Sequence, residues 1–280
     1  MRTLIFGAKG QLGRDLLHVF GGAGEVLGCD LPEVDVADAS SLEALVHDFA
    51  PDLLLNAAAY TDVDGAEDHL MEAFQANESG ARNVAEAAAK RNVPVVYYST
   101  DYVFDGTKNT PYLPDDALAP IGIYGASKAS GEAATRKANA HHFILRTAWL
   151  YGPGGNNFVE KILRAADARP SLKVVNDEVG SPTHTLDLAE ATLAAVRTTA
   201  YGTYHVVNAG ECSRYEMAGA LLRLAGRMTP ITPCASSEFP SKAARPAYSV
   251  LDTTAFAEAT GYAPRPWNEA LAAYIERRES

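Results

Sequence analysis

The fold is decided by residues 4–13, which read Leu4-Ile5-Phe6-Gly7-Ala8-Lys9-Gly10-Gln11-Leu12-Gly13. The three apolar residues predict a short buried strand. Residues 11–20 predict a helix, because Leu12, Leu16, Leu17 and Phe20 fall on one face. The glycines between strand and helix permit a tight turn and a close approach of backbone to phosphate. The free N–H groups of the helix start also favour an anion.

This stretch therefore predicts a site for a dinucleotide pyrophosphate, made by Gly7, Gly10, Gln11, Leu12 and Gly13. The glycine spacing is G-x-x-G-x-x-G and differs from the G-x-G-x-x-G pattern of many dinucleotide-binding turns. The position of the glycines directly after the opening strand strengthens the prediction. The alternative is an ordinary tight turn without a ligand.

Strands and helices alternate along the rest of the first half. Further strands are predicted at residues 25–29, 52–56, 94–99 and 143–146, with a later one at 203–207. Helices are predicted at 40–49 with Ser40 as N-cap, at 73–91, from about 124 onward, at 186–197 and at 215–225. Such alternation predicts an α/β fold, a doubly wound Rossmann-type parallel sheet with a smaller C-terminal substrate lobe.

The domain boundaries follow from where this alternation loosens. Residues 1–147 are predicted to form the dinucleotide-binding domain, with 183–207 and 248–260 returning to it. Residues 148–182, 208–247 and 261–280 are predicted to form the substrate-binding lobe.

Composition narrows the class of protein. A net charge of −11 argues against a nucleic-acid partner, although a locally positive pocket can still take a small anion. Cys29, Cys212 and Cys234 stand far apart, so neither a disulfide framework nor a cysteine metal site is indicated. No stretch is apolar enough to span a bilayer, and the chain opens directly into a strand. We expect a cytoplasmic protein without a membrane partner.

Asp30 ends the second predicted strand. A carboxylate there can accept hydrogen bonds from the adenosine ribose and repels a 2′-phosphate, which favours NAD. Lys9 can partly compensate, so the predicted cofactor is NADPH or NADH. The alternative for Asp30 is a turn residue that ends the strand.

Tyr124 and Lys128 stand four residues apart, on one face of a predicted helix. A phenol is a poor proton donor at neutral pH, and a neighbouring ammonium is expected to lower its pKa. The tuned phenol can then protonate a carbonyl oxygen. Ser99 and Thr100 end the fourth strand, where one hydroxyl can bind the same carbonyl. The alternative is a surface pair without a role.

Together these motifs resemble the extended short-chain dehydrogenase/reductases. Longer blocks resemble the dTDP-4-dehydrorhamnose reductase family over almost the whole chain. These blocks are Gly10–Gly13, Asn56–Thr61 with Val63-Asp64 and Ala66-Glu67, Ser99–Gly106, Arg146–Trp149, Gly155–Phe158, and Ala244-Arg245-Pro246 with Leu251-Asp252.

The resemblance implies reduction of the C4 ketone of dTDP-4-dehydro-L-rhamnose. By resemblance, Tyr124 protonates the C4 oxygen, Lys128 binds the nicotinamide ribose and Thr100 binds the carbonyl. Further cofactor-binding residues are implied at Asp35, Val36, Ala57, Ala58 and Ala59, and substrate-binding residues at Val63, Phe104, Trp149, Asn157 and Arg245. A guanidinium suits the diphosphate, while the indole suits a sugar face or a base, or packs in the core.

Several alternatives stay open. The chain can reduce another nucleotide-linked 4-keto-6-deoxysugar. A dehydratase would carry a glutamate after Asp101, where this chain has Tyr102, and an epimerase would retain its cofactor through turnover. A non-catalytic regulatory subunit of the methionine adenosyltransferase type also resembles this family. Some members form a homodimer through a metal held by acids, but His184-Thr185-Leu186-Asp187 offers only one acid, and we predict no metal site.

Overall fold

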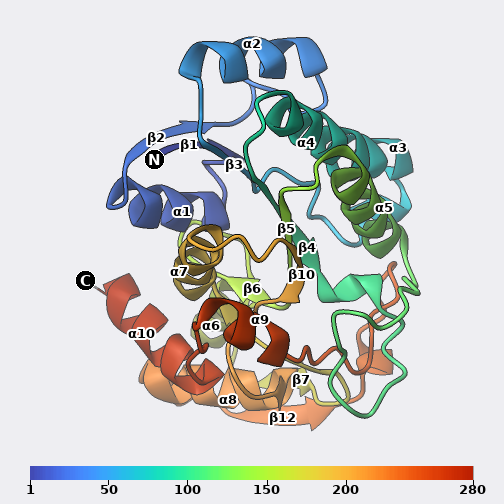
Figure 1. Cartoon of the computed structure of the whole chain (residues 1–280). Helices are drawn as coiled ribbons and strands as arrows, with labels where there is room; N and C mark the ends of the chain where they lie inside the picture. Colours follow the sequence, from blue (N-terminus) through green and yellow to red (C-terminus); the bar gives the residue numbers. More distant parts are fainter. Residues whose placement is uncertain (280) are drawn as a thin grey trace.

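The computed structural model describes residues 1–279, and its centre is a six-stranded parallel sheet (Figure 1). The strand order is β10-β5-β4-β3-β1-β2. The strands are β1 (Arg2–Phe6), β2 (Glu25–Cys29), β3 (Leu53–Asn56), β4 (Val95–Thr100), β5 (His142–Thr147) and β10 (Gly202–His205). The chain reverses its direction of winding between β1 and β3, and open α/β sheets bind ligands outside such a switch point. The predicted doubly wound fold is confirmed.

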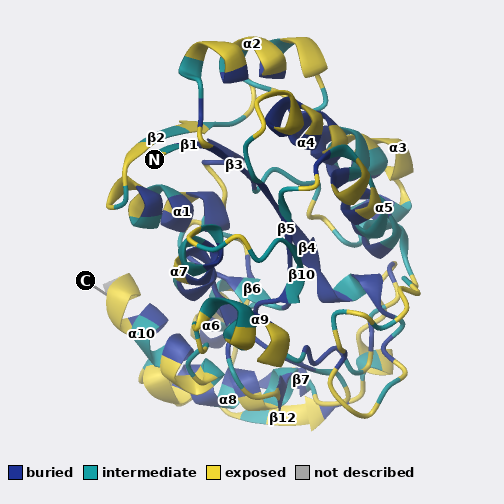
Figure 2. Ribbon diagram, viewed as in Figure 1, coloured by how far each residue is buried: buried dark blue, intermediate teal, exposed yellow. Residues whose placement is uncertain are grey.

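Helices cover both faces of this sheet (Figure 1). One face carries α1 (Gln11–Gly21) and α7 (Thr185–Val196). The other carries α2 (Ala39–Phe49), α4 (Gly80–Lys90) and α5 (Ile123–Ala138). Successive strand residues point to opposite faces, so Ile5 packs with the first pair of helices and Leu4 with α2 and α4. The inner strands β1, β3, β4 and β5 are thus buried on both sides, as the dark blue in Figure 2 shows, whereas the edge strands β2 and β10 are partly exposed.

The C-terminal half adds three two-stranded sheets at the end of the large sheet where β4 and β5 terminate (Figure 1). Their strands are β6 (Leu150–Tyr151) with β9 (Thr183–His184), β7 (Leu172–Val175) with β12 (Ile231–Cys234), and β8 (Val179–Gly180) with β11 (Cys212–Ser213). The helices are α6 (Phe158–Ala168), α8 (Arg214–Leu224), α9 (Thr254–Thr260) and α10 (Trp267–Glu279). We call this part the lobe, except α9, whose Phe256 packs in the core beneath α7.

Two helix predictions were wrong in detail. The N-cap of α2 is Asp38, whose carboxylate accepts a hydrogen bond from the Ser40 N–H, so Ser40 itself lies inside the helix. The helix predicted at 73–91 begins earlier, as α3 (Leu70–Phe74), and passes through a π-helical turn (Gln75–Ser79) before α4. Among residues 1–279, no helix combines the length and apolarity needed to cross a bilayer.

Candidate active site

A cleft of about 920 Å³ lies between the switch point of the sheet and the lobe. The glycine loop lines one part of it and residues of the lobe line the other. The cleft collects all but one of the predicted site residues, and the exception is Phe104. These lining residues are Gly7, Gly10, Gln11, Leu12, Gly13, Asp30, Asp35, Val36, Ala57, Ala58, Ala59, Val63, Thr100, Tyr124, Lys128, Trp149, Asn157 and Arg245.

The glycine loop is shaped by its own backbone. Gly7 has a φ of +78°, in the left-handed region that favours glycine. A Cβ on Gly13 would lie 2.1 Å from the carbonyl oxygen of Gly7, so only glycine lets α1 start this close to the turn. Gly10 caps α1 without a side-chain hydrogen bond. The first N–H groups of the helix therefore face the cleft free of side-chain caps, which fits a pyrophosphate group.

Asp30 is held firmly beside this loop. Its carboxylate accepts hydrogen bonds from the backbone N–H groups of Lys9 and Leu31, both at 2.8 Å. The ammonium of Lys9 is turned away, onto Glu33 at 2.8 Å and the Leu31 carbonyl at 2.9 Å. The cation that was expected to compensate for Asp30 is therefore engaged by a second carboxylate.

Thr100, Tyr124 and Lys128 meet at the middle of the cleft. Tyr124 lies in the first turn of α5, and its hydroxyl is hydrogen-bonded with that of Thr100. Thr100 ends β4 and donates a hydrogen bond to the Asp101 carboxylate at 2.9 Å. Tyr124 also packs edge-on against Tyr102, with ring centroids 5.6 Å apart. The trio can therefore bind a carbonyl oxygen and supply it with a proton.

The predicted direction of the Tyr124 pKa was wrong. Burial raises the pKa of Tyr124 above its usual value, and the charge of Asp101 adds to this effect. The Lys128 ammonium lies 4.2 Å from the centroid of the Tyr97 ring, and burial lowers the Lys128 pKa to about 7. The phenol is thus kept in its protonated form, as a proton donor requires.

A buried asparagine connects α5 to the cleft wall that follows β3. Asn77 lies in the π-helical turn, and its amide exchanges hydrogen bonds with the backbone N–H and carbonyl of Tyr60 at 2.9 and 3.1 Å. The same amide donates to the Ser127 hydroxyl at 2.9 Å, between Tyr124 and Lys128. Sequence analysis missed this residue, because a π turn leaves no clear periodic signal.

Paired charges line another part of the cleft. The guanidinium of Arg245 donates to the Asp64 carboxylate at 3.0 and 3.4 Å. Asn157 lines the cleft, but its amide caps α6 by accepting from the Glu160 N–H at 3.1 Å and donates to the Gly152 carbonyl at 3.0 Å. Its polar atoms are thus largely used within the protein.

A family model described as the RmlD substrate binding domain matches residues 1–280. The chain belongs to the RmlD family. It is a nucleotide-sugar reductase of that family. It is 42% identical over its full length to the spore coat polysaccharide biosynthesis protein SpsK of Bacillus subtilis, of which it covers 98%.

Two solved structures are also similar. The dTDP-4-dehydrorhamnose reductase of Clostridium acetobutylicum has a TM-score of 0.97 and 38% identity, with all of both chains covered. The Bacillus anthracis dTDP-4-dehydrorhamnose reductase, solved in complex with NADP, has a TM-score of 0.95 and 37% identity over 99% of both chains.

Phe104 is the one predicted substrate-binding residue that lies outside the cleft lining in this structure. It is fully buried and stacks on Tyr112 at a centroid distance of 4.3 Å. The Arg146 guanidinium lies 5.2 Å from the centroid of the same ring. Phe104 therefore supports the β4 end from behind and does not line the cleft.

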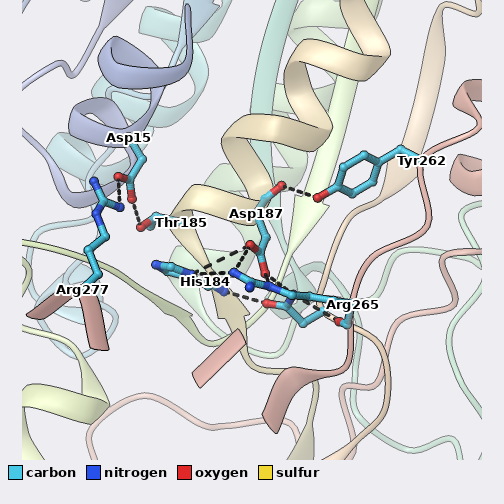
Figure 3. Close-up of polar contacts among 8 residues, drawn as sticks. Asp15, His184, Thr185, Asp187, Tyr262, Arg265 and Arg277 are labelled. Carbon is cyan, nitrogen blue, oxygen red and sulfur yellow. Dashed lines mark hydrogen bonds and ion pairs between the residues drawn. The ribbon is translucent and has the colours of Figure 1, made fainter. Parts of the chain in front are cut away.

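The segment from His184 to Asp187 in this RmlD-family chain belongs to an ion-pair network (Figure 3). Asp187 accepts two hydrogen bonds from Arg265 at 2.6 and 2.8 Å, and a third from Asn208. Burial lowers the pKa of His184 to about 4, so its imidazole is neutral near pH 7. Within residues 1–279, no three His, Cys, Asp or Glu side chains gather to hold a metal.

A separate polar cluster beside this network fastens α10 to the sheet domain. Asp15 of α1 is fully buried, and its carboxylate accepts hydrogen bonds from Arg277 of α10 and Thr185 of α7 at 2.6 and 2.5 Å (Figure 3). The arginine neutralises a buried carboxylate that would otherwise be costly. The Asp15 cluster therefore joins three helices.

Proposed function

We propose that this protein reduces the C4 ketone of dTDP-4-dehydro-L-rhamnose to dTDP-L-rhamnose with NADH or NADPH. One observation carries the proposal: a single cleft joins the uncapped start of α1, the Thr100-Tyr124-Lys128 trio and a lobe that presents a guanidinium and an indole. A nucleotide-sugar ketone needs these three components side by side, because cofactor, carbonyl and diphosphate must be held at once.

The cofactor, when bound, supplies the hydride. Gly7, Gly10 and Gly13 let the backbone approach its pyrophosphate, and Asp30 accepts from its adenosine ribose. Asp35, Val36 and the Ala57–Ala59 segment line the same half of the cleft. The similar Bacillus anthracis enzyme binds NADP. In this chain, Asp30 and the Glu33-bound Lys9 favour NADH.

The proton comes from Tyr124. Its raised pKa keeps the phenol protonated, and its hydroxyl lies beside that of Thr100. Thr100 and Tyr124 together hold the carbonyl oxygen, so negative charge that develops there is stabilised and then neutralised by the phenol proton. Lys128, behind Tyr124 on α5, binds the nicotinamide ribose and adds positive charge beside the phenolate that forms.

The identity of the sugar has a second candidate. The 42% identical Bacillus subtilis relative is named for a spore coat polysaccharide, and its name specifies no sugar. A different nucleotide-linked 4-keto-6-deoxysugar is therefore the second candidate substrate. A regulatory subunit without catalysis is disfavoured, because Thr100, Tyr124 and Lys128 line one cleft together.

The test follows nicotinamide absorbance with dTDP-4-dehydrorhamnose made in place by the preceding enzymes. We expect substrate-dependent oxidation of NADH or NADPH and formation of dTDP-rhamnose. The Tyr124→Phe variant should lose about 100-fold or more in kcat while cofactor affinity stays unchanged, because only the proton donor is removed. Undiminished turnover of this variant would exclude the assigned role. If folded protein oxidises neither cofactor, the other sugars become the candidates.

A further inference from the structure

Arg214 is a second arginine in the substrate half of the cleft, and sequence analysis assigned it no role. It is the first residue of α8 and follows Ser213, whose side chain forms a capping box with Glu216. Its side chain lines the cleft that also contains Arg245, and only 17% of that side chain is exposed. A mostly buried cation needs partners or a ligand.

The protein holds Arg214 mainly by the faces of its guanidinium. The central carbon lies 3.4 Å from the Trp149 ring centroid and 5.2 Å from that of Phe158. Its one ion pair within residues 1–279 runs from Nε to Glu178 at 3.6 Å. Within the same part of the chain, Glu178 is the one side chain joined to this guanidinium by an ion pair or a hydrogen bond. Stacking thus fixes the orientation of the guanidinium and leaves N–H donors for a ligand.

The indole beneath Arg214 is placed at a backbone cost. Trp149 has a φ of +48°, in the left-handed region where a bulky residue is an outlier. The ring also lies against Gly180, where a Cβ would be 2.5 Å from Trp149 Cε2. Strained residues of this kind cluster at ligand clamps and active sites. An indole that served only core packing would not need this left-handed backbone conformation.

Both guanidinium groups act on the same neighbour. Burial raises the pKa of Tyr102 to about 12, whereas the charges of Arg214 and Arg245 each work to lower it. Arg245 comes from the loop that precedes β-bridge residue Tyr248, and Arg214 comes from the start of α8. Two cations from different segments of the lobe therefore converge beside Tyr102.

We propose that Arg214 and Arg245 form a two-arginine clamp for the diphosphate of the nucleotide sugar, with Trp149 supporting the plane of Arg214. A diphosphate fits two planar cations, because each guanidinium can place paired N–H donors on phosphate oxygens. The Asp64 and Glu178 carboxylates balance the two charges when no anion is bound. The clamp rests on the nucleotide-sugar substrate of the proposed function and adds a second binding residue to it.

The experiment measures binding of dTDP without turnover. In a Trp267→Phe background, Trp149 is the sole tryptophan, so its fluorescence reports ligands that approach Arg214. Arg214→Met should weaken dTDP binding by about 10- to 100-fold, as expected for lost hydrogen bonds to a charged group. Thymidine, which has no phosphate, should bind both forms equally. The dTDP affinity of Arg214→Lys should lie between those of the parent and Arg214→Met, because lysine keeps the charge and lacks the paired N–H donors of a guanidinium.

Arg223→Met is the matched control. It removes the same charge from the same helix, but Arg223 is exposed and lies outside the cleft lining. It should bind dTDP as the parent does. Calorimetric titration of each variant, with the native Trp267 in place, checks affinities independently of fluorescence.

Three results would overturn the clamp: unchanged dTDP affinity in Arg214→Met, an equal loss for thymidine, or no dTDP binding by the parent protein. The outcome is separable from the reductase assay. Arg214-dependent dTDP binding without ketone reduction would remove the proposed reaction and keep the clamp, whereas reduction with an Arg214-independent affinity would do the opposite.

Discussion

The two halves of the cleft are built in different ways. The half that we propose for the cofactor, the cofactor half, is mainly backbone, with glycines and alanines that follow β1 and β3 directly. The half that we propose for the substrate, the substrate half, is mainly charged and aromatic side chains. Among them are Asp64, Trp149, Arg214 and Arg245, which come from segments far apart in the chain. A Cβ added at Gly7 or Gly13 would overlap backbone atoms, whereas paired side chains can exchange one partner for another. Single substitutions in the cofactor half should therefore cause large losses of affinity, whereas those in the substrate half should change affinity by smaller steps.

Gly13→Ala tests the cofactor half and should have the largest effect. The new Cβ would meet the Gly7 carbonyl oxygen at 2.1 Å, so α1 must shift away from the glycine loop. We expect cofactor affinity to fall by at least about 100-fold, or ~3 kcal/mol, by titration with NADH. Gly21→Ala, where a Cβ meets nothing within 4 Å, is the control. Equal losses in both variants would refute the argument from backbone contact.

Arg245→Ala tests the substrate half. It removes a guanidinium from the substrate side and leaves the glycine loop intact. The KM for the sugar nucleotide should rise by about 10- to 100-fold, while NADH affinity stays unchanged. Lys242→Ala removes the neighbouring cation, which pairs with Asp68 outside the cleft lining, and should leave KM unchanged. A cofactor defect in Arg245→Ala would show that the halves are not separate.

Glu33→Gln asks whether a side chain can tune the cofactor half too. The change releases the Lys9 ammonium, which can then turn toward a 2′-phosphate. Because the pair is exposed, the effect should be small, with the kcat/KM ratio of NADPH to NADH rising by up to about fivefold. Glu43→Gln, which breaks the similar exposed pair with Lys90, serves as control. A fall in the ratio would contradict this view of Lys9.

Sequence alone predicts the cofactor half better than the substrate half. The strand at 25–29 and the glycine loop were placed correctly, because local patterns determine both. Arg214 was missed, since no local pattern shows which loops of the lobe meet. Phe104 was assigned to the cleft by resemblance, but the turn after β4 points it into the core. The Tyr124 pKa was misjudged, because burial depends on packing that the sequence does not display.

The π-helical turn at Gln75–Ser79 links the length of the chain to the register of the cleft walls. A π turn holds one residue more than an α-turn of the same span. Deleting one residue there would give the turn the α-helical spacing of about 100° per residue and would change the directions of the side chains inside it. Asn77 would then face away from Tyr60 or from Ser127, and the two walls it joins would come apart. The extra residue of the π turn therefore sets the position of Asn77, and deleting it would break these contacts even if every side chain in the cleft were kept.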